Sequence, residues 1–112
     1  MIIKSILKEL QTEVNPIARS LHTNDHFKIL IIGFKTGMKI KEFKTMNTSK
    51  LTVISGSVLY RENNVSLKLE KFDEIDIPAD IKHSVEALEE SLCLLTQGVA
   101  QPYLIQQGNF VV

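Results

Sequence analysis

His83 is the residue whose type and position are best suited to chemistry. It follows a short strand that stops at Pro78 and a turn over residues 79–82, and a strand of mostly apolar residues comes after it. A side chain just past a turn between two strands is well placed to line the mouth of a β-barrel. Because imidazole titrates near neutral pH, His83 could act as a general acid or base, or exchange hydrogen bonds with a ligand.

The neighbouring residues offer His83 little support for catalysis. Their spacing identifies no partner carboxylate, so no catalytic dyad and no catalytic residue is predicted. A purely structural alternative is that His83 hydrogen-bonds a backbone carbonyl or Glu86 and so orders the turn. Both interpretations stay open at this stage.

The other reactive side chains are weaker candidates. Cys93 lies in an apolar strand and is expected to behave as a small buried hydrophobic residue. It is the single cysteine, so it forms no internal disulfide, and a reducing cytoplasm is the expected location. His22 and His26 flank Asn24-Asp25, which indicates a turn rather than a helix, so we expect both to be surface residues.

Composition narrows the class of protein. The chain has 112 residues, of which 44% are hydrophobic and 23% charged, as is usual for one globular domain over residues 1–112. Thirteen basic residues balance thirteen acidic ones, so we expect neither nucleic acid nor a membrane surface as a partner. No apolar run of membrane-spanning length occurs in the sequence.

The elements that must position these side chains are one helix and several short strands. Apolar residues at helical spacing predict a helix over residues 1–15, ended by Asn15-Pro16, that packs on the domain or on a partner subunit. Strands are predicted over residues 27–34, 38–43, 51–60, 65–69, 74–77 and 91–96. Gly56 suggests a bend or corner inside one of them, and 61–64 a turn. The pattern predicts an all-β antiparallel sandwich or barrel.

Residues His26 to Thr96 resemble a small single-domain cupin. Gly37 and Gly56 stand at the two ends of the first cupin motif, and Pro78 and His83 fall on positions of the second. The resemblance implies a cupin-type antiparallel β-barrel, a jelly-roll-like double-stranded β-helix, with its core over residues 26–96. It also implies a homodimer.

The metal-ligand positions of the cupin motifs are largely replaced. Phe43 and Thr45 stand where the two histidines of the first motif are usual, Ser49 stands at its glutamate, and only His83 remains. One imidazole cannot hold a transition metal, which needs three or four ligands, so neither a metal nor another cofactor is expected. The candidates for lining a ligand pocket are His83, Phe43, Thr45, Ser49 and Cys93. Phe43 could instead fill the core, and Thr45 and Ser49 could be rim residues.

Three functions follow from these expectations. The leading one is a metal-free module that binds a small molecule or regulates another protein. The first alternative is a divergent metal-dependent cupin enzyme, such as a dioxygenase, isomerase or lyase, that uses His83. The second is a structural or interaction protein with a filled barrel. The apolar tail over residues 97–112 is predicted to form a strand at a homodimer interface.

Overall fold

The computed structural model describes residues 1–43 and 47–98, with the side chains of residues 42 and 43 left aside. In this part of the chain one helix precedes nine strands. Their bounds are α1 (Ile2–Leu10), β1 (Ile17–Thr23), β2 (Phe27–Phe34), β3 (Lys39–Phe43), β4 (Ser49–Ser55), β5 (Ser57–Glu62), β6 (Val65–Glu70), β7 (Glu74–Ile77), β8 (His83–Ala87) and β9 (Ser91–Gly98). No helix in residues 1–43 and 47–98 is long and apolar enough to cross a membrane.

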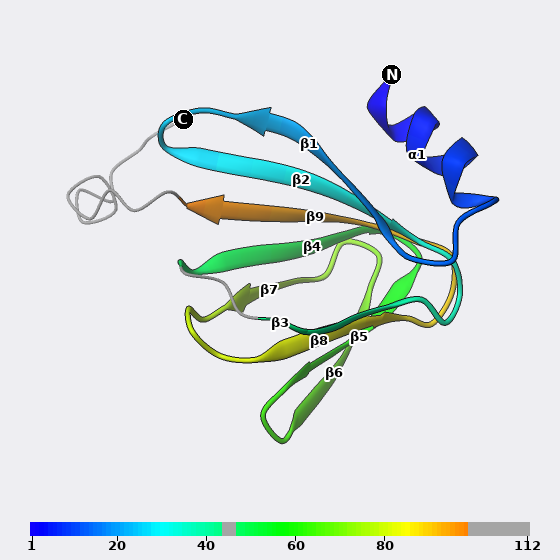
Figure 1. Cartoon of the computed structure of the whole chain (residues 1–112). Helices are drawn as coiled ribbons and strands as arrows, with labels where there is room; N and C mark the ends of the chain where they lie inside the picture. The colour runs from blue at the N-terminus through cyan, green and yellow to red at the C-terminus, as the bar shows by residue number, and fades with distance from the viewer. Residues whose placement is uncertain (44–46, 99–112) are drawn as a thin grey trace.

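The strands form two antiparallel sheets that face each other (Figure 1). The first has five strands in the order β1-β2-β9-β4-β7, and the second has four in the order β3-β8-β5-β6. Consecutive β8 and β9 therefore lie in different sheets, as in a jelly roll. The prediction of an all-β antiparallel barrel with an N-terminal helix is confirmed.

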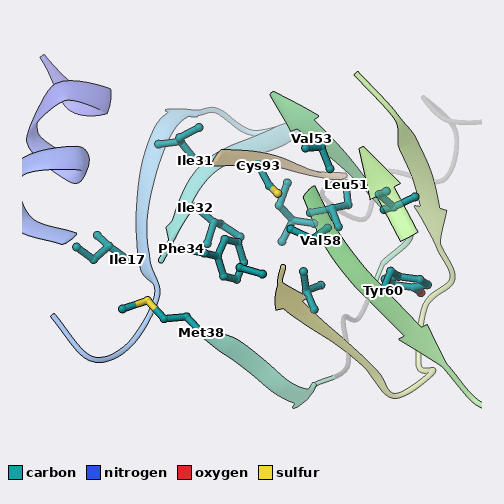
Figure 2. Close-up of a cluster of buried hydrophobic side chains, with 14 of the residues drawn as sticks. Ile17, Ile31, Ile32, Phe34, Met38, Leu51, Val53, Val58, Tyr60 and Cys93 are labelled. Carbon is teal, nitrogen blue, oxygen red and sulfur yellow. The ribbon is translucent and has the colours of Figure 1, made fainter. Parts of the chain in front are cut away.

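The main core fills the space between the sheets. Cys93 of β9 pairs in register with Ile32 of β2 and Val53 of β4, so these three side chains share the inner face. Val58 and Tyr60 approach them from the opposite sheet, and both are fully buried (Figure 2). Alternating apolar residues on strands of both sheets thus produce one hydrophobic core.

Helix α1 packs against β1 and β2 on the outer face of the five-stranded sheet (Figure 1). Ile6 and Leu10 point at this face and are fully buried. Gly33 permits the close approach, because a Cβ placed there would lie 2.5 Å from Cγ2 of Ile6. At the edge of the contact Glu9 accepts a hydrogen bond from Arg19 of β1 at 3.0 Å.

Gly56 is the corner at which the chain passes from one sheet to the other. Its φ of +80° is unfavourable for residues with a side chain, and a Cβ there would lie 2.8 Å from Cα of Ser91. The Ser91 hydroxyl accepts a hydrogen bond from the Ser57 amide at 3.1 Å and lies 3.0 Å from the Ser57 carbonyl oxygen. The predicted bend is confirmed, and the predicted strand over 51–60 is two strands.

The boundaries differ from the predictions at several points. Strand β1 was not expected, because six of its seven residues are exposed and the strand carries little apolar signal. The helix ends at Leu10 rather than near residue 15, and Val14 beyond it is 82% exposed. In β6 only Leu69 is buried, whereas Val65 and Leu67 are exposed on this edge strand. Residues 99–112, which include most of the predicted interface tail, lie outside the described residues.

The two other histidines lie near the β1–β2 turn. The Asn24 side-chain oxygen accepts hydrogen bonds from the backbone amides of His26 and Phe27 at 2.8 and 2.9 Å. His22 and His26 are both exposed. Their predicted placement at a surface turn therefore agrees with the structure.

Candidate functional site

His83 is the first residue of β8, and its side chain is buried with 1% exposure. The preceding turn contains Asp80 at a φ of +60°, a conformation that aspartate tolerates better than most residues. His83 Nδ1 lies 3.0 Å from the carbonyl oxygen of Ile81. Because a carbonyl oxygen can only accept, the Nδ1–H group is the donor in this contact. The structure therefore contains the backbone contact that the structural interpretation of His83 predicts.

Two polar residues of β5 lie close to His83. The Tyr60 ring centroid is 6.0 Å from that of His83, and the Tyr60 hydroxyl donates a hydrogen bond of 2.7 Å to Oε2 of Glu62. Glu62 is the register partner of His83. Burial, together with the hydrogen bond to Glu62, raises the pKa of the Tyr60 phenol well above its usual range. Tyr60 therefore stays protonated and acts as a donor rather than as a base.

This polar group could not be found from the sequence. Tyr60 and Glu62 are about twenty residues from His83 along the chain, and they meet it only through the pairing of β5 with β8. That pairing joins segments with no shared local motif. The signal that was available is the alternation of Val58, Tyr60 and Glu62, which places all three on one face of β5.

The other predicted pocket residues are distributed unevenly. Phe43 of β3 lies opposite His83 in the strand register. Ser49, the first residue of β4, is buried, and its hydroxyl donates a hydrogen bond of 3.4 Å to the carbonyl oxygen of Asn47. Cys93 is fully buried in the centre of β9, and burial raises the pKa of its thiol to about 12. Thr45 lies outside the described residues.

The residues at the cupin metal positions do not fit a transition metal. Phe43 carries no ligand atom, the Ser49 hydroxyl is directed at a backbone carbonyl, and His83 alone supplies a nitrogen. Among the described residues no group of three or more His, Cys, Asp or Glu side chains could hold a metal ion. The described residues around His83 therefore do not supply the set of ligands that a transition metal requires.

A pocket of about 340 Å³ borders the His83 end of the four-stranded sheet. It is lined by Lys39, Arg61, Asn63, Lys82, His83 and Ser84. Its volume is near the lower end of the range for small-molecule sites, roughly 300–1,000 Å³. Neither Ser49 nor Cys93 is among its described lining residues, so among the described candidates His83 is the link between the predicted site and this pocket.

The strand register places this pocket on the outer face of the sheet. Arg61 of β5 pairs with Ser84 of β8, and Lys39 of β3 pairs with Glu86 two residues further along. Because side chains alternate along a strand, these residues point away from the face that carries Tyr60 and His83. An ion pair of 3.1 Å between Arg61 and Glu86 is consistent with this placement. The pocket lining was missed from the sequence because its cations come from three separate elements.

Comparison with known proteins supports the architecture. No protein-family model matches the sequence, and no curated protein matches it either. A cupin superfamily protein from Desulfitobacterium hafniense superimposes with a TM-score of 0.73 at 16% identity over 78% of this chain and 80% of that one. An RmlC-like cupin from Shewanella frigidimarina gives a TM-score of 0.72 at 15% identity over 83% and 84%.

An enzyme is also among the similar structures. The DMSP lyase DddQ from Ruegeria pomeroyi superimposes with a TM-score of 0.72 at 9% identity, over 79% of this chain and 49% of that one. At such low identities the likeness shows a shared fold and carries no activity from one chain to another.

Proposed function

Because this chain has the cupin fold, we propose that it is a small-ligand-binding module that works without the metal centre of cupin enzymes. The observation that carries the proposal is the pocket of about 340 Å³ at the His83 end of the four-stranded sheet. Its lining is polar and charged, which suits recognition of a specific small molecule through hydrogen bonds. The replaced metal positions make the metal-dependent alternative the weaker one.

His83 has a positioning role in this proposal. Its ring is held in the interior by the carbonyl of Ile81 and lies beside Tyr60, while the residue also borders the pocket. A ligand that changes the conformation of Ser84 would therefore also shift the buried imidazole of His83, the residue next to it in the chain. Such coupling could also serve a regulatory function.

The first experiment measures metal content and ligand binding on the same protein. Elemental analysis after purification without chelator should find less than about a tenth of an equivalent of any transition metal. A fragment screen by ¹⁵N–¹H NMR should then find compounds that shift the backbone amides of Arg61, Lys82 and Ser84. A stoichiometric metal that is lost in His83→Ala, or a screen in which no compound shifts these amides, would overturn the proposal.

The second candidate function is that of a structural or interaction protein whose barrel is filled by side chains, and one observation favours it. Phe34, Val53 and Tyr60 are all fully buried in the described part of the barrel interior (Figure 2). In that case the protein would act through its surface, and small molecules would leave the NMR spectrum unchanged. The same screen therefore separates the two candidates.

The homodimer remains a prediction. It rests on the apolar character of residues 97–112, with Tyr103, Leu104 and Ile105 among them. Light scattering coupled to gel filtration should give twice the mass of 12.7 kDa. A constant monomer mass at high protein concentration would contradict it.

A further inference from the structure

We propose that the apolar tail of the chain, residues 99–112, packs on its own subunit in a groove between the first turn of α1 and strand β1. The inference goes beyond the proposed function and does not depend on it. The groove has a volume of about 630 Å³, and its described lining residues are Met1, Ile2, Ile3, Lys4 and Leu21. It shares no described lining residue with the pocket at His83.

The hydrophobic residues of this groove leave much of their apolar surface exposed. Met1 is 86% exposed, and Ile2, Ile3 and Leu21 are 40%, 38% and 36% exposed. Single exposed hydrophobic residues are common on protein surfaces, whereas apolar residues gathered in one concave surface mark a site of contact. The groove therefore fits an apolar partner.

The tail has a composition that matches the groove. Residues 99–112 contain no Lys, Arg, Asp or Glu, and their large apolar members are Tyr103, Leu104, Ile105, Phe110, Val111 and Val112. Contact between tail and groove removes apolar surface of both from water, which is favourable in proportion to the area buried. Lys4 can keep its ammonium group in water while its methylene groups contact an apolar segment. Tail and groove are therefore complementary in polarity.

The tail begins close to the groove. Gly98, the last described residue, pairs in register with Phe27 of β2, and the ring centroid of Phe27 lies 5.4 Å from that of His22 on β1. His22 follows Leu21 in the chain, and Leu21 lines the groove. Strands β9, β2 and β1 are consecutive neighbours in one sheet (Figure 1). Two interstrand spacings, together about 10 Å, therefore separate Gly98 from β1.

The length of the tail allows it to reach the groove of its own subunit. Extended, residues 99–112 span at most about 46 Å, and residues 99–102 alone span up to about 13 Å, which is enough to reach β1. The apolar residues from Tyr103 onwards then remain for the groove. Because the link is covalent, the effective concentration of the tail at this groove is about millimolar, which a second copy does not reach in dilute solution. Docking within one subunit is therefore favoured over exchange between subunits, and a homodimer would use another surface.

A spin label on the tail tests this docking in the whole chain. The label is attached to the thiol of Gln107→Cys, and because Cys93 is fully buried, the reagent reacts selectively with the tail. The methyl NMR signals of Ile2 and Ile3 should lose most of their intensity through broadening by the label. The signals of Leu67, which is 41% exposed on β6 of the other sheet, should keep most of theirs. The broadening should not change with protein concentration, because docking within one subunit is intramolecular.

Variants assign the broadening to this groove. Leu21→Ser should shift the docking equilibrium about three- to tenfold toward the undocked tail, because it removes an apolar contact from the groove. Leu67→Ser is the matched control, since Leu67 is also an exposed leucine on a strand at the edge of a described sheet. It should leave the broadening of Ile2 and Ile3 unchanged. Leu104→Ser, which removes an apolar side chain from the tail, provides a second test should Leu21→Ser fold poorly.

Each outcome supports or overturns the inference. Broadening of Ile2 and Ile3 that Leu21→Ser reduces and Leu67→Ser preserves would support it. Unbroadened signals of Ile2 and Ile3, equal broadening of Leu67, or an equal effect of the two variants would overturn it. A mixture of spin-labelled protein with isotope-labelled protein that carries no spin label shows whether the tail docks on a second copy. Broadening of Ile2 and Ile3 in that mixture would overturn docking within one subunit and support the exchanged strand of the homodimer prediction.

Discussion

Gly56→Ala tests the corner between the two sheets. The residue has a φ of +80°, and a Cβ there would meet the backbone carbonyl oxygen of Glu90 and the Ser91 hydroxyl at less than contact distance. The backbone of Glu90 and Ser91 cannot move aside without disturbing β9, which begins at Ser91. Gly37 is the matched control, because its φ of +85° is similar but nothing lies within 4 Å of its Cβ position.

The expected loss of stability follows from four contributions. A left-handed backbone costs an alanine about 1–2 kcal/mol, and the stiffer unfolded chain returns about 0.4–1 kcal/mol of this. These two contributions apply to both glycines, so Gly37→Ala should lose about 1 kcal/mol. At Gly56 overpacking adds about 1–3 kcal/mol, and disturbance of the two Ser91 contacts to Ser57 adds about 1 kcal/mol. Gly56→Ala should therefore lose about 2–4 kcal/mol more than Gly37→Ala.

Urea and thermal unfolding measure this difference. With roughly 4 °C per kcal/mol for a domain of this size, Gly56→Ala should melt about 8–16 °C below Gly37→Ala. The free energy of unfolding should fall with urea concentration at the same slope in both variants. Equal slopes would show that neither substitution changes the compactness of the folded or unfolded state. Free energies of unfolding that agree within about 0.5 kcal/mol would refute the steric argument at this corner.

Three further perturbations test other parts of the structure. Because burial raises the pKa of Cys93 from 9.0 to about 12, the folded state binds more protons than the unfolded state in this range, so stability should fall from about pH 9 to pH 12. In Cys93→Ala the stability should fall less steeply with pH. At pH 8 the thiol of the native protein should resist thiol reagents, whereas the thiol of the protein unfolded in urea should react with them. Ile6→Ala should cost about 2–5 kcal/mol and raise hydrogen exchange in α1, and unchanged exchange there would contradict its docking role. Ser91→Ala should cost about 1–3 kcal/mol in urea unfolding, with Ser66→Ala on exposed β6 as a neutral control.

The fold could be predicted wherever local pattern and burial agree. β2 and β7 were predicted at the observed bounds because their apolar residues and flanking turns are local signals. β1 was missed because an exposed edge strand needs no apolar alternation. Val65 and Leu67 alternate as though half-buried, yet β6 is the edge strand of its sheet within residues 1–43 and 47–98, and both side chains are exposed.

The candidate site was only partly accessible from the sequence. His83 stood out because a turn and Pro78 frame it locally. Lys39, Arg61 and Glu62 did not, because strand pairings between distant segments bring them to the same end of the sheet. Side-chain alternation then decides that Glu62 joins the interior group and Arg61 the outer pocket. Register is a tertiary property, and no spacing in one sequence reveals it.

The strand order has a consequence for synthesis on the ribosome. β9 lies between β2 and β4, and β8 lies between β3 and β5, so the two strands made last among those described occupy interior positions of both sheets. Until they emerge, the apolar strand β2 has β1 on one edge and an open edge on the other. The nascent chain must therefore hold several unpaired strand edges in solution, where chaperones would bind them and where a ribosomal pause would promote aggregation.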